Sequence, residues 1–73
     1  MTTRETLLAT GIGLQTIYKH LADGTLEGER TGSRWNIPAS EVYGWSVWMW
    51  ERGRALMYPP FRVLRYIQDF GLE

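Results

Sequence analysis

Several residue types and patterns are missing from this chain of 73 residues, and each absence narrows what it can be. It has no cysteine, so neither a disulfide nor a thiolate metal site is available. The only histidine is His20, which leaves too few ligands for a structural zinc site and is expected to be half-buried and structural. There is no run of about 18 apolar residues, and the N-terminal segment lacks the pattern of a signal peptide. We therefore expect a soluble, cytoplasmic protein with no metal, no other cofactor and no membrane partner.

Net charge is also missing, because 8 Lys and Arg residues balance 8 Asp and Glu residues. A strongly basic domain is the usual mark of a nucleic-acid-binding protein, and the overall charge does not indicate one here. Any affinity for DNA must depend on where the cations lie, so we expect modest binding by one copy and self-association on DNA. An enzyme is the least expected class, because acid–base catalysis needs paired groups in a cleft and the carboxylates here are scattered.

What the chain does have is a generous apolar fraction of 44%, with four tryptophans. This is enough for one small hydrophobic core, near the lower size limit of domains that fold without disulfides or metals. We predict a single domain over residues 1–73. Its predicted class is mainly α with a small β-hairpin.

Two short helices joined by a glycine-containing turn are predicted over residues 2–24. The first begins at Thr2-Thr3-Arg4-Glu5, which has the spacing of a capping box, and ends at Gly11. The second runs from about Leu14 to Ala22. Its buried stripe has the i, i+3, i+7 spacing of one helix face and consists of Leu14, Ile17 and Leu21. Such a pair makes a helix-turn-helix, and its second helix has the right size for a DNA major groove.

The hydrophobic period changes from helical to alternating within residues 25–37. Residues 29–31 and 34–37 are predicted to be short strands, with the turn signal Gly32-Ser33 between them. Trp35 alternates with polar neighbours, so we expect it to face the core. This segment is therefore predicted to be a two-stranded hairpin that follows the helix pair.

One long and one short helix are predicted in the second half of the chain. The long one spans residues 38–57, and Glu41 complements the positive end of its dipole. Its predicted core-facing stripe is Val42, Trp45, Met49 and Leu56. Tyr58-Pro59-Pro60 breaks this helix, and the short one follows over residues 60–71. The apolar face of the short helix is predicted to contain Val63, Leu64, Ile67 and Phe70.

Four sequence segments occur in a fixed order along the first two thirds of the chain. They are Thr16-Ile17-Tyr18-Lys19, Gly24-Thr25-Leu26, Arg30-Thr31-Gly32-Ser33-Arg34-Trp35-Asn36-Ile37-Pro38 and Ser40-Glu41-Val42-Tyr43-Gly44-Trp45. In this order they resemble the excisionase and MerR type of winged helix-turn-helix, and the last segment is similar to AlpA-type prophage regulators. The resemblance covers about residues 4–48. It implies a sequence-specific DNA-binding accessory or regulatory protein of a phage or mobile element.

The resemblance also implies which residues contact double-stranded DNA. The second helix would enter the major groove through Gln15, Thr16, Tyr18 and Lys19. The hairpin would act as a wing on the backbone or minor groove through Arg30, Ser33 and Arg34. The chain departs from the family pattern at Gly13 and Leu14, where a serine and an arginine commonly contact phosphate.

These residues also have structural interpretations. The predicted helix contacts are equally typical of an ordinary solvent-exposed helix surface, and Tyr18 can simply cover the edge of the core. Arg30 and Arg34 can instead pair with Glu27 or Glu29, in exposed ion pairs that contribute only about 0–1 kcal/mol each.

An apolar surplus remains once the core positions are filled. We expect a surface for self-association or for a partner, formed by Trp48, Trp50, Phe61 and Phe70. The same half of the chain carries a local basic cluster of Arg52, Arg54, Arg62 and Arg65. The competing hypothesis is therefore a protein-interaction module, or a small terminase-like subunit, that binds a partner through this half. The resemblance adds an integrase or another phage protein as a candidate partner.

Overall fold

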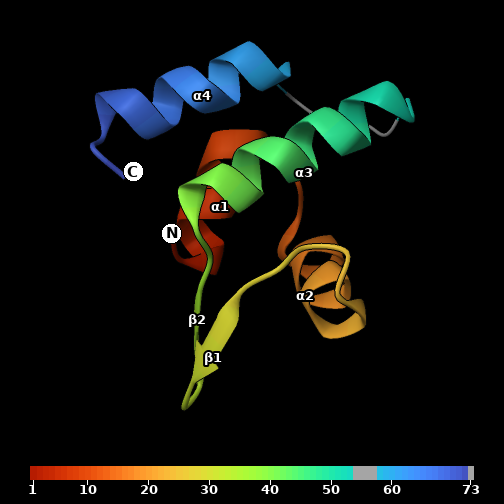
Figure 1. The fold of residues 1–73 in the computed structure, drawn as a ribbon, viewed down its shortest axis with the longest axis vertical. Coiled ribbons are helices and arrows are strands. Elements are labelled where there is room, and N and C mark those ends of the chain that lie inside the picture. The colour runs from red at the N-terminus through yellow and green to blue at the C-terminus, as the bar shows by residue number, and fades with distance from the viewer. Residues whose placement is uncertain (54–57, 73) are drawn as a thin grey trace.

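The computed structural model describes residues 1–53 and 58–72. In these residues the chain forms four helices and one antiparallel hairpin, so the mainly helical class with a small hairpin is confirmed. The elements are α1 (Thr3–Thr10), α2 (Leu14–Asp23), β1 (Glu29–Thr31), β2 (Arg34–Asn36), α3 (Ala39–Glu51) and α4 (Pro60–Asp69). Helix α1 packs against α2 and α4, and α3 packs against α4. The hairpin projects from the opposite end of the molecule to α4, next to α2 (Figure 1).

Local signals form the first helix pair as the sequence predicts. The Thr2 hydroxyl accepts a hydrogen bond from the Glu5 backbone N–H at 3.0 Å, and the Glu5 carboxylate accepts one from the Thr2 N–H at 2.8 Å. Gly11 ends α1 in the left-handed conformation, with φ of 75°. Ile12 is buried in the core and anchors the turn, while α2 ends one residue later than predicted, at Asp23. The capping box and the end of α1 are therefore confirmed.

The core is built from apolar side chains of all the described helices together with the segments that flank the hairpin. It consists of Ala9, Ile12, Ile17, Leu21, Leu26, Ile37, Val42, Trp45, Met49, Val63 and Ile67. The predicted burial of Leu14 is wrong, because Leu14 is the first residue of α2 and is 38% exposed. Phe70 is also exposed, although its spacing from Val63 and Ile67 is that of one helix face, because it is the C-cap residue after α4 and its ring packs against Tyr66, with centroids 4.5 Å apart.

The end of α3 differs from the sequence prediction. The helix ends at Glu51 rather than at residue 57, and Gly53 follows with a φ of 66° that α-helices do not adopt. The predicted core residue Leu56 and the predicted cluster member Arg54 lie outside the described residues. None of the helices in the described residues combines the length and the apolar character needed to cross a membrane.

The hairpin is held to the beginning of α1 by backbone hydrogen bonds. Glu29 lies opposite Asn36, and Gly32 occupies the turn with φ of 63°. Directly after β2, the Ile37 N–H donates to the Met1 carbonyl at 2.7 Å, and the Met1 nitrogen donates to the Ile37 carbonyl. This pairing fixes the base of the hairpin beside the N-terminus of α1.

Candidate nucleic-acid interface

Three parts of the chain meet at one shallow groove with a volume of about 300 Å³. They are the N-terminus of α1, one flank of α2 and the tip and second strand of the hairpin. The lining residues are Thr2, Thr3, Arg4, Tyr18, Ser33, Arg34 and Trp35. Two of them are arginines, and no carboxylate of the described residues lines the groove. The Thr3 hydroxyl lies 3.4 Å from the Tyr18 hydroxyl and joins α1 to α2 within it.

The exposed surface of α2 contains three of the four predicted helix contacts. Gln15 and Lys19 are exposed, and their i, i+4 spacing places them one turn apart on the same side. Tyr18 is 46% exposed and lines the groove. Thr16 is half-buried and lies one turn before His20, which places it at the edge of this surface.

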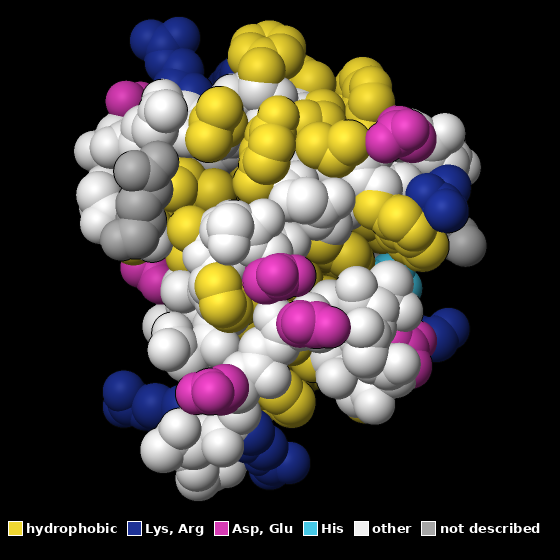
Figure 2. Space-filling model, viewed as in Figure 1, with side chains coloured by type: hydrophobic (Ala, Val, Ile, Leu, Met, Phe, Trp, Pro, Cys, Tyr) yellow, Lys and Arg dark blue, Asp and Glu magenta, His cyan; other side chains and the backbone are white. Residues whose placement is uncertain are grey.

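The register of the hairpin separates its two arginines. Arg30 lies opposite Trp35, whereas Arg34 lies opposite Thr31. Because successive residues of a strand point to opposite faces, Arg30 and Arg34 extend from opposite faces of the hairpin. Figure 2 shows basic side chains on both sides of the hairpin tip. Only Arg34 lines the groove, beside Arg4.

The alternative in which the hairpin arginines pair with nearby glutamates is not observed. Among the residues that the structure describes, the ion pair within 4.0 Å is between Arg65 and Asp69, at 3.8 Å. The Arg30 side chain instead donates from Nε to the Gly32 carbonyl at 3.0 Å. Both hairpin arginines are exposed, which leaves their guanidinium groups accessible to an anionic ligand.

Acidic side chains gather in a separate groove. Although the net charge is zero, acidic and basic side chains are therefore concentrated in different parts of the surface. This second groove, of about 430 Å³, contains the carboxylates of Glu27, Glu29 and Glu41. It shares no lining residue with the groove that contains Arg4 and Arg34. Figure 2 shows acidic side chains close together in the middle of the viewed face.

Arg4 is a candidate site residue that the sequence analysis did not select. It lies in the first turn of α1, where a cation opposes the positive end of the helix dipole. The helix dipole therefore gives no structural reason for an arginine at this position. A cation placed where the dipole disfavours it is the sequence signal that points to a binding role for Arg4. Its partners in the groove, Tyr18 and Arg34, become its neighbours only through the tertiary fold.

His20 has the structural position expected for it, and it determines how α2 sits on α3. The Trp45 indole Nε1–H donates to His20 Nδ1 at 2.9 Å, which requires that Nδ1 carries no proton. The imidazole also meets Trp45 and Trp48 edge-on, with ring centroids 5.6 Å and 6.2 Å apart. These contacts fix the rotation of α2 and therefore the direction in which Gln15 and Lys19 point.

The four aromatic residues predicted to form one partner surface do not share one face. Trp50, Phe61 and Phe70 are 49%, 68% and 65% exposed, whereas Trp48 is half-buried with the Arg52 guanidinium 4.0 Å from its ring centroid. With 3.6 residues per turn, Trp48 and Trp50 lie on nearly opposite sides of α3. The same geometry places Phe61 and Phe70 on opposite sides of α4.

The predicted basic cluster is dispersed in a similar way. Arg65 pairs with Asp69, and the Arg62 guanidinium lies 5.1 Å from the ring centroid of Tyr58. Arg52 lies over Trp48 at the end of α3. These cations are partly engaged by their own neighbours, whereas Arg4 and Arg34 make no side-chain ion pair or hydrogen bond with the residues that the structure describes.

Comparisons with protein-family models, with curated proteins and with solved structures found no match for this chain. Within the described residues, no three His, Asp or Glu side chains come together as metal ligands would. What the chain does is therefore inferred from its own surfaces.

Proposed function

We propose that the chain is a winged helix-turn-helix DNA-binding protein, with α2 in the major groove and the hairpin as a wing on the backbone or minor groove. The observation that best supports this is the groove in which Arg4 and Arg34 flank Tyr18. Together with the excisionase-like and AlpA-like segments of the sequence, it supports an accessory or regulatory role in a phage or mobile element.

The dimensions of α2 suit the major groove. Its 10 residues extend about 15 Å, and the major groove of B-DNA is about 12 Å wide and admits an α-helix. Gln15 lies in the first turn of the helix, the part that contacts base edges in helix-turn-helix proteins, and Lys19 lies one turn further along the same side. A glutamine pairs bidentately with adenine, and a lysine donates to guanine O6 and N7.

The groove beside α2 has the composition expected of a phosphate contact. The guanidinium groups of Arg4 and Arg34 can each bind a phosphate bidentately, and the Tyr18 hydroxyl adds a neutral donor. Because the two arginines come from α1 and the hairpin, they would bracket the backbone on one side of α2. Arg30, on the other face of the hairpin, would contact the phosphate backbone of the DNA strand next to the hairpin tip.

The separation of charge gives the molecule a preferred orientation toward DNA. The carboxylates of Glu27, Glu29 and Glu41 lie in a different groove and would be repelled by phosphates. A molecule with one basic and one acidic region is oriented by the field of the duplex even when its net charge is zero. The lack of net charge is therefore compatible with DNA binding.

The experiment that tests this proposal is fluorescence anisotropy of a labelled duplex titrated with the protein at two salt concentrations. Counterion release predicts that the logarithm of the affinity falls linearly with the logarithm of the salt concentration. Lys19→Ala and Arg34→Ala should each weaken binding, and loss of a phosphate contact should lower the slope by about one. Arg65→Ala on α4 is the control. If Lys19→Ala and Arg34→Ala bind like the parent, the proposed surface is wrong.

A second candidate function is a protein-interaction module that has the same fold without DNA binding. It is favoured by the exposure of Trp50, Phe61 and Phe70, since large exposed aromatic side chains often mark a partner surface. It predicts no duplex binding at low salt, even at high protein concentration. The titration described above therefore decides between the two candidates.

A further inference from the structure

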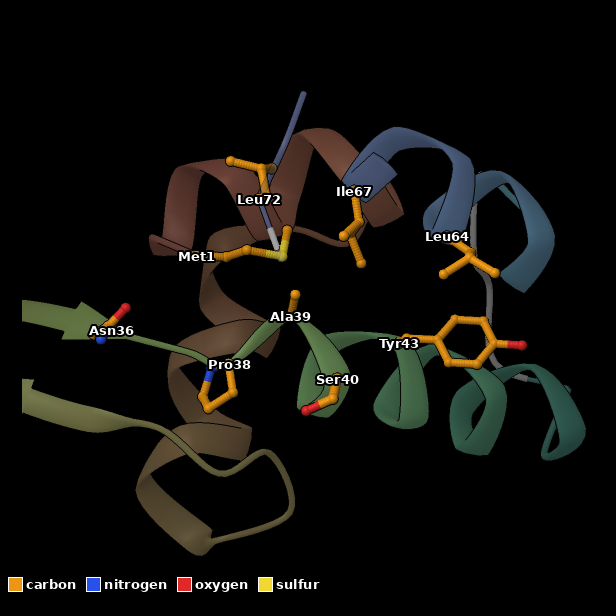
Figure 3. A pocket seen from close by; sticks show the side chains of 9 residues that line it. All are labelled: Met1, Asn36, Pro38, Ala39, Ser40, Tyr43, Leu64, Ile67 and Leu72. Atoms are coloured by element: carbon orange, nitrogen blue, oxygen red, sulfur yellow. The ribbon is translucent and has the colours of Figure 1, made fainter. Parts of the chain in front are cut away.

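A groove with a volume of about 650 Å³ lies between α3, α4 and the base of the hairpin (Figure 3). Apolar side chains from widely separated parts of the chain line it, namely Met1, Ala39, Tyr43, Leu64, Ile67 and Leu72. Most of them are only half-buried, so the apolar lining is accessible from solvent. None of the residues proposed to contact DNA lines this groove.

This apolar groove adjoins the acidic groove. Asn36 and Pro38 line both, so they form the boundary between the two. On the far side of that boundary lie Glu27, Glu29 and Glu41. Among the described residues, no lysine or arginine lines either groove. The two grooves therefore form one surface that is apolar along α3 and α4 and negatively charged toward the hairpin.

We propose that these joined grooves bind a segment of a partner protein in which bulky apolar side chains are followed by lysines or arginines. The apolar side chains would fill the space beside Tyr43 and Leu64, and the cations would meet the three carboxylates. A groove of this size is within the range that binds compact apolar groups, and short helical segments commonly dock in such grooves. Charge complementarity then sets the direction in which the segment lies.

A second copy of this chain is a less suitable occupant. Among the described residues it offers two apolar and basic segments, which are Phe61 with Arg62 and Arg65 on α4, and Trp50 with Arg52 at the end of α3, where Glu51 lies between the two. However, Arg65 is paired with Asp69, and that carboxylate would approach the acidic groove together with the arginines. DNA is excluded as an occupant because its phosphates would meet carboxylates. The site is thus separate from the proposed DNA interface and does not depend on it.

The proposal is tested with a labelled peptide and no DNA present. The peptide has two leucines one helical turn apart followed by a run of lysines, and its binding is followed by fluorescence anisotropy. Two control peptides replace the leucines by serine or the lysines by glutamate, and both should lose binding. Combined Glu27→Gln, Glu29→Gln and Glu41→Gln substitutions, all at exposed positions, should weaken binding about tenfold. Glu51→Gln, which lies outside both grooves, should bind like the parent.

Substitutions in the apolar part complete the test. Leu64→Ala should weaken binding, and Ser40→Arg, at an exposed position in the same groove, should do so without altering the core. Arg34→Ala should leave peptide binding unchanged, so a failure of the DNA proposal is distinguishable from a failure here. Absence of peptide binding, or equal binding by the serine peptide or the glutamine variant, would overturn the proposal. So would a dimer in sedimentation that Ser40→Arg abolishes, because it would identify a second copy as the occupant.

Discussion

At the scale of single residues, the contact between His20 and Trp45 links the proposed DNA-binding helix to the rest of the protein. His20 is half-buried, and its Nδ1 receives the Trp45 indole N–H at 2.9 Å. Trp45 itself is buried, so its N–H has little access to water if this partner is lost. Within the part of the chain that the structure describes, the pair therefore combines packing with a hydrogen bond that satisfies a buried donor.

Replacement of Trp45 by phenylalanine should destabilise the fold by at least about 1 kcal/mol. The substitution removes a hydrogen bond worth about 0.5–1.5 kcal/mol and also leaves space in the core. Urea unfolding measures the change. Trp50→Phe is the matched control, because Trp50 is 49% exposed and its substitution should change the stability by less than about 0.5 kcal/mol. Equal losses for the two variants would contradict the importance of the His20 contact.

Asp23 makes the stability of the turn after α2 depend on pH. The Thr25 hydroxyl and the Thr25 backbone N–H donate to its carboxylate, and these hydrogen bonds hold the pKa of Asp23 below its ordinary value. A carboxyl group with a lowered folded-state pKa stabilises the fold above its unfolded pKa and loses this effect as the pH falls through the folded value. Asp23→Asn should therefore flatten the acid side of a plot of stability against pH. An unchanged acid limb would show that Asp23 does not contribute.

Gly13 and Leu14 offer a gain-of-function test of the DNA interface. Gly13 is the N-cap of α2 in an extended conformation, and a side chain there would meet no atom within 4 Å. Gly13→Ser combined with Leu14→Arg should bind a duplex more tightly and with a steeper salt dependence, because it adds a hydroxyl and a cation that can contact phosphate. Gln68→Arg on α4 adds the same charge elsewhere and serves as the control. Equal gains for both would show that only net charge matters.

At the scale of elements, the loop between α2 and β1 depends on a close approach at Gly28. A Cβ there would lie 3.1 Å from both Ile37 Cγ1 and Leu21 Cδ2, and 3.3 Å from the Asn36 carbonyl oxygen. A side chain there would push these neighbours away by a few tenths of an ångström. Gly28 therefore permits close packing of this loop, which lines the acidic groove, against the hairpin and α2.

Gly28→Ala should destabilise the protein by about 1–3 kcal/mol, as overpacking of a filled core does. Thermal or urea unfolding provides the measurement. Gly44→Ala on the exposed side of α3 is the matched control, since its Cβ would meet no atom within 4 Å. It should stabilise the helix by about 0.5–1 kcal/mol. The same sign for both substitutions would contradict the close packing at Gly28.

The elements that could be predicted from sequence are those with local signals. The capping box at Thr2, the glycine that ends α1 and the Gly32-Ser33 turn act over a few residues, so their patterns specify the structure directly. The sequence prediction extends α3 past Glu51 because it gives more weight to the apolar residue Leu56 than to Gly53, although a glycine at this place commonly ends a helix. Leu14 is predicted to be buried because it has the spacing of the buried stripe of α2. The periodicity of a helix does not show how far along it the neighbouring elements cover that stripe, and they leave Leu14 exposed.

The candidate interface could be predicted only in part. Gln15, Tyr18 and Lys19 follow from the periodicity of α2, since residues opposite its buried stripe must be exposed. The convergence of Arg4 with Arg34 depends on the pairing of Met1 with Ile37, which no local pattern encodes. The separation of the hairpin arginines onto two faces, by contrast, follows from the register that the two-residue turn Gly32-Ser33 sets.

At the scale of the whole molecule, charge and apolar surface are divided between different regions. One groove contains Arg4 and Arg34, and another contains the carboxylates of Glu27, Glu29 and Glu41. The apolar groove along α3 and α4 adjoins the acidic one and shares no lining residue with the basic one. In the two proposals above, DNA would bind on one side of the molecule and a protein segment on another, and a net charge of zero is compatible with both because the two grooves have opposite charge.

We propose that the affinity of this protein for DNA comes from the position of its positive charges and not from their number. One titration tests this most directly. Arg4→Ala with Arg34→Ala removes two charges from the proposed interface, and Arg62→Ala with Arg65→Ala removes two charges from α4. Duplex anisotropy at two salt concentrations should show that the first pair weakens binding and lowers the salt slope by about two, while the second pair binds like the parent. Equal losses for both pairs, or no loss for the first, would contradict the account.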